Sequence, residues 1–406
     1  MNKPIKIRLH VLSPIHIGCD DVYEPTSFII DEQRKKLIEF DPVEFVKRLK
    51  PQEMGEFNKA ASGDNLLAIF KAIKRLYKSE IKGRKVEITD YMVNHYKKIL
   101  SMGTFDKKAV INQFTVNKTA FNPQDNMPYI PGTSLKGALR TAYLSTLAGD
   151  KKISGWKGKA DELETRLLGR KEGKDEMSSD PFRMVKVSDL LPVEKVNTKI
   201  VYAVNKKKKK SDKESLADKG SVYQIFEIIQ QGAIFEGVIN IDTPERTSGI
   251  NNPINMETLL LSAHKFYAVN LKQEITPLNE ALGLKHKADI AANAQFKDRF
   301  EQDAFLIRLG RHSGAEAVTI EGNRIIKIKG RGNEFSYKDH ATTLWLASDE
   351  PRPKNTANLL PFGWAVLEVL PFDGTTALYP DRKRIVKPEI VETDIKTENS
   401  SFKTGF

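Results

Sequence analysis

The chain has 406 residues, of which 40% are hydrophobic and 29% charged, as in a soluble globular protein with one large core or two ordinary ones. Its formal charge of +12 at pH 7 attracts polyanions, so nucleic acid is the first expected partner and an anionic membrane surface the second. The single cysteine, Cys19, excludes an intramolecular disulfide and a zinc site built from several thiolates.

The N-terminal segment alternates charged and apolar side chains from its start, which excludes the continuous apolar core of a signal peptide. No run in the sequence approaches the ~18 apolar residues that a membrane-spanning helix needs. A single cysteine also suits a reducing compartment. These features predict a cytoplasmic protein with no membrane partner.

Residues 5–12 are predicted to form the first strand, because apolar and polar side chains alternate there. The segment near 42–110 is predicted to be a helical insertion, with a first helix that Asp41 caps and Pro42 begins. Further helices are expected over residues 64–80, 90–100, 133–147 (capped by Thr133 or Ser134) and 256–270.

Later strands are predicted over residues 184–190, 304–309, 342–347 and 364–370. Two hairpins are predicted, over residues 221–242 with a turn at Gln231-Gly232 and over residues 318–328 with a turn at 321–323. The lysine-rich stretch 205–219 is too charged to be buried and is predicted to be a mobile loop.

Strands separated by helices and long excursions, with hairpins among them, predict an α+β fold and not a regularly alternating parallel sheet. A β-α-β-β-α-β core fits this order. We predict residues 1–250 to be this core with the helical insertion and the lysine-rich loop. Residues 251–372 would be a second, divergent α+β half, and 373–406 a partly flexible tail.

A first candidate site is the segment 131–140, where a proline-glycine turn leads into a helix. The first amides of a helix are unpaired and its dipole attracts anions, so Gly132, Thr133 and Ser134 could contact a phosphate. Lys136 and Arg140 are spaced to share one face of that helix. An ordinary capped helix with solvated cations is the alternative. A nucleotide P-loop is excluded, because Ala138-Leu139 stands where lysine and a hydroxyl residue are required.

A second candidate site is the segment 308–314, where a strand runs into two glycines, Gly310 and Gly314. Glycines let backbone amides approach a ligand closely. Cationic and polar side chains between them could bind phosphate or stack on bases, and they are Arg308, Arg311, His312 and Ser313. A tight turn with solvated arginines is the alternative.

A third candidate is His16 at the end of the first strand, which could act as general acid or base in metal-independent RNA cleavage. A histidine hydrogen-bonded to backbone or to RNA is the commoner role for such a position. The sequence has no HExxH or other metal-ligand spacing. We therefore expect no metal, no cofactor and no catalytic residue, with an endoribonuclease using His16 as the alternative function.

Several of these segments resemble one family. Residues 12–18 and 129–140 are similar to the opening and the first-helix signature of the RAMP proteins of type III CRISPR effector complexes. The segments 179–183, 187–189 and 308–320 resemble more narrowly the terminal, capping subunit of the type III-A (Csm) complex.

The resemblance implies an RRM-like (ferredoxin-like) core elaborated by insertions and glycine-rich loops. It further implies binding of CRISPR RNA (crRNA) toward its 3′ end beside the backbone RAMP subunit, and a part in crRNA maturation, with host nucleases recruited and no intrinsic catalysis. The predicted RNA contacts are His16, the 132–140 positions and the 308–314 positions named above. A third possibility is a scaffold whose basic surface only offsets the negative charge of an RNA that other subunits hold.

Overall fold

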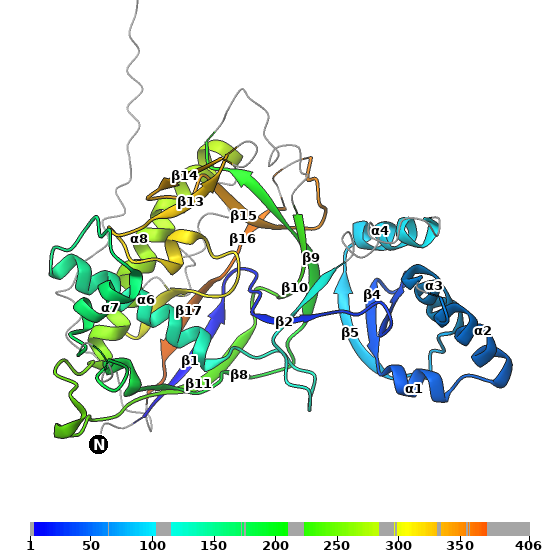
Figure 1. The fold of residues 1–406 in the computed structure, drawn as a ribbon, viewed down its shortest axis with the longest axis horizontal. Helices are drawn as coiled ribbons and strands as arrows, with labels where there is room; N and C mark the ends of the chain where they lie inside the picture. The colour runs from blue at the N-terminus through cyan, green and yellow to red at the C-terminus, as the bar shows by residue number, and fades with distance from the viewer. Residues whose placement is uncertain are drawn as a thin grey trace, which may run out of the picture.

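The computed structural model describes most of the chain up to residue 371. The described residues are 4–63, 65–102, 115–171, 173, 176–209, 223–283, 296, 299–330, 334–354, 356 and 358–371. They form a mixed α+β structure with two large curled sheets (Figure 1). The predicted tail 373–406 and residues 210–219 of the lysine-rich stretch lie outside the described residues. In the described part, no helix is both long and apolar enough to cross a membrane.

The first sheet is built around β1 (Ile5–Val11), which pairs antiparallel with β11 (Ile234–Ile241) and β17 (Trp364–Val369). Its strand order is β12-β17-β1-β11-β7, where β12 is Ala304–Arg308, β7 is Val185–Val187, and β8 (Leu191–Pro192) also pairs with β11. The predicted alternation of β1 is confirmed, since Ile7 and Leu9 are fully buried while Arg8 faces the other way.

Two long helices share one core with this sheet. They are α6 (Gly132–Asp150) and α8 (Met256–Leu282), and their apolar side chains, such as Leu139 and Leu259, pack in one cluster with Ile7 and Phe305. The shorter α7 (Ala160–Leu168) follows α6. Strands β12 and β17, from the predicted second half of the chain, therefore complete the same sheet as β1 from the predicted first half.

The second sheet has the order β2-β6-β10-β9-β5-β4-β3. The long strand β9 (Thr198–Lys207) pairs with β10 (Tyr223–Ile229) on one side, and on the other with β5 (Gly83–Ile88) and β15 (Thr343–Ser348). The remaining strands are β2 (Gly18–Val22), β3 (Phe28–Asp31), β4 (Lys36–Phe40), β6 (Val116–Thr119) and β16 (Leu360–Pro361).

The predicted helical insertion forms a lobe at the edge of the second sheet, at the right of Figure 1. Its helices are α1 (Pro42–Lys47), α2 (Pro51–Ala61), α3 (Leu66–Leu76) and α4 (Asp90–Ser101). Asp41 caps α1 as predicted, because its carboxylate accepts a hydrogen bond from the Val43 amide at 2.8 Å. The apolar stripe of α3 buries Phe70 and Ile73.

The hairpin predicted at 221–242 is wrong. β10 and β11 are both strands, but β10 belongs to the second sheet and β11 to the first. The connection from β10 to β11 crosses between the sheets and lies beside the connection from β1 to β2, where Ile15 pairs with Ile229. The Gly232 amide donates to the Val11 carbonyl at 2.9 Å, and its φ of +90° suits glycine.

The hairpin predicted at 318–328 is also wrong. Its expected turn is held by Asn323, whose side chain donates to the Ile153 carbonyl and accepts from the Trp156 amide. A 3-10 turn at Ala315–Val318 replaces the first strand, and the hairpin forms further along, from β13 (Ile326–Lys329) and β14 (Phe335–Lys338).

Two smaller predictions also need correction. Residues 205–207 of the lysine-rich stretch belong to β9 and pair with β15, so this part is not a loop. Helix α6 is not capped by Thr133 or Ser134. It begins at Gly132 after Pro131, without a side-chain cap.

Candidate nucleic-acid interface

Two of the predicted sites meet where the chain crosses between the sheets. The loop after β12, residues 309–314 (hereafter the glycine loop), lies against the connection that carries His16. The Arg311 amide donates to the His16 carbonyl at 2.8 Å, and the Gly363 amide, from the turn before β17, donates to the Pro14 carbonyl at 2.9 Å. Three segments that are distant in the sequence thus form one junction.

The close approach of another backbone segment explains why the first glycine of this loop, Gly310, has no side chain. Gly310 has φ of +82°, and a Cβ at this position would lie 2.5 Å from the His16 carbonyl oxygen. His312 also has a positive φ, +65°, which is uncommon for a residue with a side chain. The hydroxyl of Ser313, which is buried, donates to the Gly310 carbonyl and closes the turn. The loop is therefore a rigid turn.

Aromatic rings surround His312. Its ring stacks on Trp345, with centroids 4.4 Å apart, and lies 5.0 Å from the ring of Phe226. Its Nε2 is 3.2 Å from the amide oxygen of Gln224. Burial, with the nearby Arg311 charge, lowers the pKa of His312 to about 3. His312 is thus neutral near pH 7 and supplies a packed ring in place of the predicted charge.

Arg311 is the exposed cation of the glycine loop. Its guanidinium lies over the ring of Phe226, 5.3 Å from the centroid, and it makes no ion pair with any described residue. A cation that is held over a ring but has no carboxylate partner can accept a phosphate without breaking an internal pair. Arg311 is therefore the predicted contact that the geometry favours most.

Arg308 is a core residue in the structure, contrary to its predicted role. Only 5% of it is exposed, and its guanidinium donates to the buried Glu274 carboxylate at 2.6 Å and to the Phe362 carbonyl at 2.9 Å. The guanidinium also lies over the Trp364 ring at 4.5 Å. Since its donors already have partners inside the core, Arg308 is not placed to bind a ligand.

His16 is equally enclosed. It is 1% exposed, its Nδ1 is 2.7 Å from the Glu227 carbonyl oxygen, and its ring lies 4.3 Å from that of Phe226. Burial lowers its pKa below the usual value. Its Nε2 is buried and finds no hydrogen-bond partner among the described residues. In this geometry the ring does not reach a surface-bound phosphate, so the general acid–base hypothesis has no support here.

The predicted anion site at the start of α6 already holds a carboxylate. The Gly132 amide donates to Asp189 at 2.8 Å, and the Ser134 amide donates to the Pro131 carbonyl. A Cβ on Gly132 would overlap the Val187 carbonyl oxygen, so tight packing explains this glycine without a ligand. Thr133 remains exposed beside this occupied helix start.

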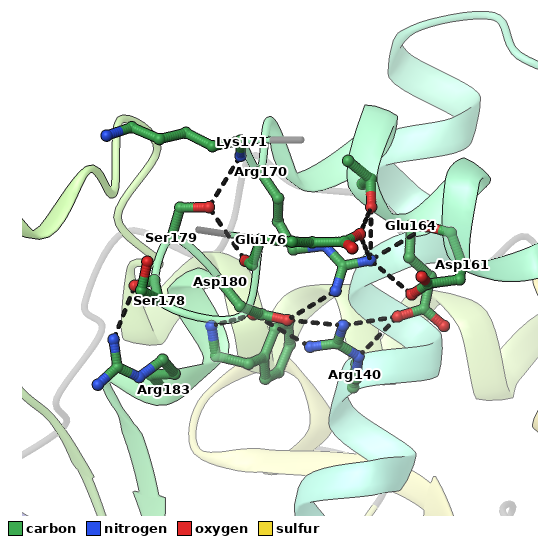
Figure 2. Close-up of polar contacts among 12 residues, drawn as sticks. Arg140, Asp161, Glu164, Arg170, Lys171, Glu176, Ser178, Ser179, Asp180 and Arg183 are labelled. Atoms are coloured by element: carbon green, nitrogen blue, oxygen red, sulfur yellow. Dashed lines mark hydrogen bonds and ion pairs between the residues drawn. The ribbon is translucent and has the colours of Figure 1, made fainter. Parts of the chain in front are cut away.

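The two predicted cations of α6, Arg140 and Lys136, differ in whether they have ion-pair partners, and Figure 2 shows those of Arg140. The Arg140 guanidinium donates to Glu164 at 2.6 Å and to Asp180 at 2.9 Å, and it lies 4.9 Å from the Phe182 ring centroid. Arg170 joins this cluster through Asp180 and Asp161. Lys136 has no ion-pair partner among the described residues, and partial burial with the nearby Lys186 charge lowers its pKa. Arg140 thus links α6 to α7, whereas Lys136 is available.

The aromatic setting of the glycine loop was not predicted. Phe226 and Trp345 lie on β10 and β15, which are far from the loop in sequence. The sequence patterns of these strands do not indicate that the two rings pack against the loop. Among the described residues, no group of three or more His, Cys, Asp or Glu side chains is placed to hold a metal ion.

Comparisons with known proteins agree with this fold. The family model described as RAMPs, the RAMP superfamily, matches residues 8–277. A Methanocaldococcus jannaschii protein named CRISPR system Cms protein Csm5 is 26% identical over 214 residues, covering 47% of this chain. The match spans 43% of that relative, less than half of its length.

Two solved structures are similar to the chain. One is a chain of a Csm-crRNA-target RNA ternary complex of a type III-A CRISPR-Cas system, with a TM-score of 0.58 and 17% identity, covering 90% of this chain and all of that chain. The other is T. onnurineus Csm5, with a TM-score of 0.50 and 17% identity, covering 88% of this chain and 99% of that one. At 17% identity, the similarity to these two structures shows a similar fold and nothing more.

Proposed function

Since the chain belongs to the RAMP superfamily, we propose that it is the crRNA-binding subunit that caps the backbone of a type III-A CRISPR (Csm) complex at the crRNA 3′ end. In this role it takes part in crRNA maturation and antiviral defence without catalysis of its own. Its partners are the crRNA and other Csm subunits, above all the backbone RAMP subunit, and host nucleases that act on the crRNA.

The comparisons support this assignment. The curated relative carries the name Csm5, and a structural neighbour belongs to a complex that contains crRNA and target RNA. The order of the four strands β17-β1-β11-β7, with α6 and α8 between them in the chain, also fits the β-α-β-β-α-β arrangement expected of an RRM-like core. We assign β12 as an additional edge strand of that core.

The observation that carries the proposal is the unpaired Arg311 on a rigid loop. Its guanidinium has no carboxylate partner among the described residues, and the loop beneath it is fixed by the hydrogen bond to His16. The α6 segment with Lys136 is tied to the same part of the molecule by Tyr267, whose hydroxyl lies within reach of the Ala138 and Ala317 carbonyls. Arg311 and Lys136 are the proposed phosphate contacts.

The test is the affinity of the purified protein for a crRNA across a salt series. Arg311→Ala should weaken binding about fivefold to tenfold and reduce the salt slope by about 0.7, the change expected for one phosphate contact of a single strand. The matched control is Arg34→Ala, which removes an exposed arginine near the helical lobe and should leave the affinity unchanged. An Arg311→Ala protein that binds like the wild type at every salt concentration would refute this contact.

A further inference from the structure

The hairpin of β13 and β14 has a face of alternating rings and cations. It forms a separate two-stranded sheet, in which Lys327 pairs with Tyr337 and Lys329 pairs with Phe335. Directly paired residues lie on the same side of an antiparallel sheet, and so do residues two apart in one strand. These four side chains (hereafter the ring–lysine face) therefore lie together.

The ring–lysine face is exposed in the described structure. Tyr337 is 65% exposed and Phe335 49%, whereas Ile326 on the opposite side is buried. The Lys327 ammonium lies 3.7 Å from the Phe335 ring centroid, and neither lysine makes an ion pair with a described residue. Two large rings left in water beside two unpaired charges are unusual for a surface with no ligand.

The hairpin is anchored to the segment that follows the glycine loop. Glu316 accepts hydrogen bonds from the Ala341 amide at 2.8 Å and from Lys208 at 2.6 Å, and its carbonyl accepts from Arg324 at 3.3 Å. Both arms of the hairpin are thus tied to one residue. In Figure 1 the hairpin lies on the opposite side of the molecule from the helical lobe.

We propose that the ring–lysine face is a stacking platform for unpaired bases of the RNA that the glycine loop binds, so this inference rests on the proposed function. Bases stack on Phe335 and Tyr337, which the strand rise places about 7 Å apart, and the two ammonium groups bind the flanking phosphates. The two unpaired lysines, on a chain of charge +12, favour a polyanion over an apolar protein surface.

The experiment measures the affinity of the full-length protein for a fluorescein-labelled single-stranded RNA of repeat sequence, across a salt series. Phe335→Ala/Tyr337→Ala should raise Kd at least about tenfold with an unchanged salt slope, since stacking carries no counterion release. Lys327→Ala/Lys329→Ala should lower the slope by about 1.4, the sum for two phosphates of a single strand.

Two controls keep the result specific. Phe335→Tyr/Tyr337→Phe keeps both rings and should bind within about twofold of the wild type. Lys59→Ala/Lys82→Ala removes the same charge from exposed lysines of the helical lobe and should leave the slope unchanged. Because all four substituted residues of the hairpin are exposed, none of these changes opens a core cavity, and thermal melting checks that each variant is folded.

The outcomes separate the two proposals. If Arg311→Ala weakens binding but Phe335→Ala/Tyr337→Ala does not, the platform is refuted and the proposed function stands. If the wild type does not bind the RNA, both are refuted. If the ring variant binds RNA normally but no longer co-purifies with other subunits of the complex, the face docks a protein and the platform is again refuted.

Discussion

In the middle of α6 (Gly132–Asp150), Arg140 donates to Glu164 and Asp180, whereas in the glycine loop Arg311 lies over Phe226 with no carboxylate partner among the described residues. Both segments combine glycines with cations, and the sequence predicts a phosphate-binding turn in each. The difference lies in what surrounds each cation. A guanidinium that already has two carboxylates stabilises the fold, and one held over a ring is free to bind a ligand.

The same contrast exists inside the 308–314 segment itself. Arg308 and Arg311 are three residues apart, yet one forms a buried pair with Glu274 and the other is exposed. The chain turns at Gly310, so that the Arg308 side chain at the strand end lies in the core and the Arg311 side chain in the loop lies at the surface. We therefore divide the cations into those that stabilise the fold, such as Arg308, and those proposed to bind RNA, such as Arg311.

The largest effect is expected for Arg308→Met. Among the described residues it leaves the buried Glu274 carboxylate with only the Trp364 indole as a hydrogen-bond partner, and breaking a buried pair in this way costs about 3–5 kcal/mol. Urea unfolding measures the loss of free energy of unfolding. Arg311→Met is the matched control and should change stability by less than about 0.5 kcal/mol. Equal losses for the two variants would contradict the division.

Arg140→Ala should cost about 1.5–3 kcal/mol of unfolding free energy, because it removes hydrogen bonds to two carboxylates in a partly buried cluster. A double-mutant cycle with Glu164→Gln should show coupling between the two side chains. Under conditions where the variant is folded, its affinity for RNA should equal that of the wild type. Weaker RNA binding by the folded variant would return Arg140 to the proposed contacts.

His312 should make the glycine loop sensitive to acid. Burial lowers its pKa to about 3 in the folded protein from the usual value of 6.5, so the unfolded chain binds a proton first as the pH falls. Its contribution to stability is therefore present above pH 6.5 and is lost progressively as the pH falls toward 3. At pH 5 the loss is roughly 2 kcal/mol.

The measurement compares unfolding free energies from pH 8 to pH 4 for the wild type and His312→Asn, a residue that tolerates the positive φ. The variant should show a smaller loss of stability on acidification. Identical pH profiles would mean that His312 titrates normally and is not packed as described.

Lys136→Ala should have the smallest measurable effect. It should weaken RNA binding about twofold to threefold and reduce the salt slope by about 0.7, with no change in stability, because the ammonium has no ion-pair partner among the described residues. Lys152→Ala, which removes an exposed lysine beyond the other end of the same helix, is the control. A Lys136→Ala effect larger than that of Arg311→Ala would reverse the ranking of the two segments.

His16→Gln should not alter RNA cleavage at all, because the ring is enclosed and its Nδ1 faces the Glu227 carbonyl. The wild type and the variant, incubated with repeat-containing RNA in EDTA, should both leave the RNA intact. Cleavage by the wild type that disappears in the variant would support the endoribonuclease alternative.

Local sequence patterns predicted where helices and strands form better than they predicted which strands pair with one another. The alternation along β1, the Asp41 cap of α1 and the apolar run of β17 are properties of neighbouring residues, and the structure confirms them. The two wrong hairpins have a different origin. A strand pattern does not specify its sheet, and Asn323 acts through a contact with a loop far away in the sequence.

The candidate site was predictable only in part for the same reason. The segment 308–314 and His16 could be singled out from the sequence. The side chains that determine the roles of Arg308, Arg311 and His312 come from distant elements, and they are Glu274, Phe226 and Trp345. Likewise nothing near Arg140 in sequence indicates Glu164 and Asp180 as its partners. Pairing across the fold determines whether a cation is available, and a single sequence does not display it.

The central claim is that the glycine loop binds the crRNA near its 3′ end. The most direct measurement is photocrosslinking in the assembled complex, with crRNAs that carry one 4-thiouridine near either the 3′ or the 5′ end. We expect the 3′ probe to crosslink to this subunit in a peptide that contains Arg311, and the 5′ probe to crosslink elsewhere. Crosslinks from the 5′ probe alone, or none to this chain from either probe, would contradict the account.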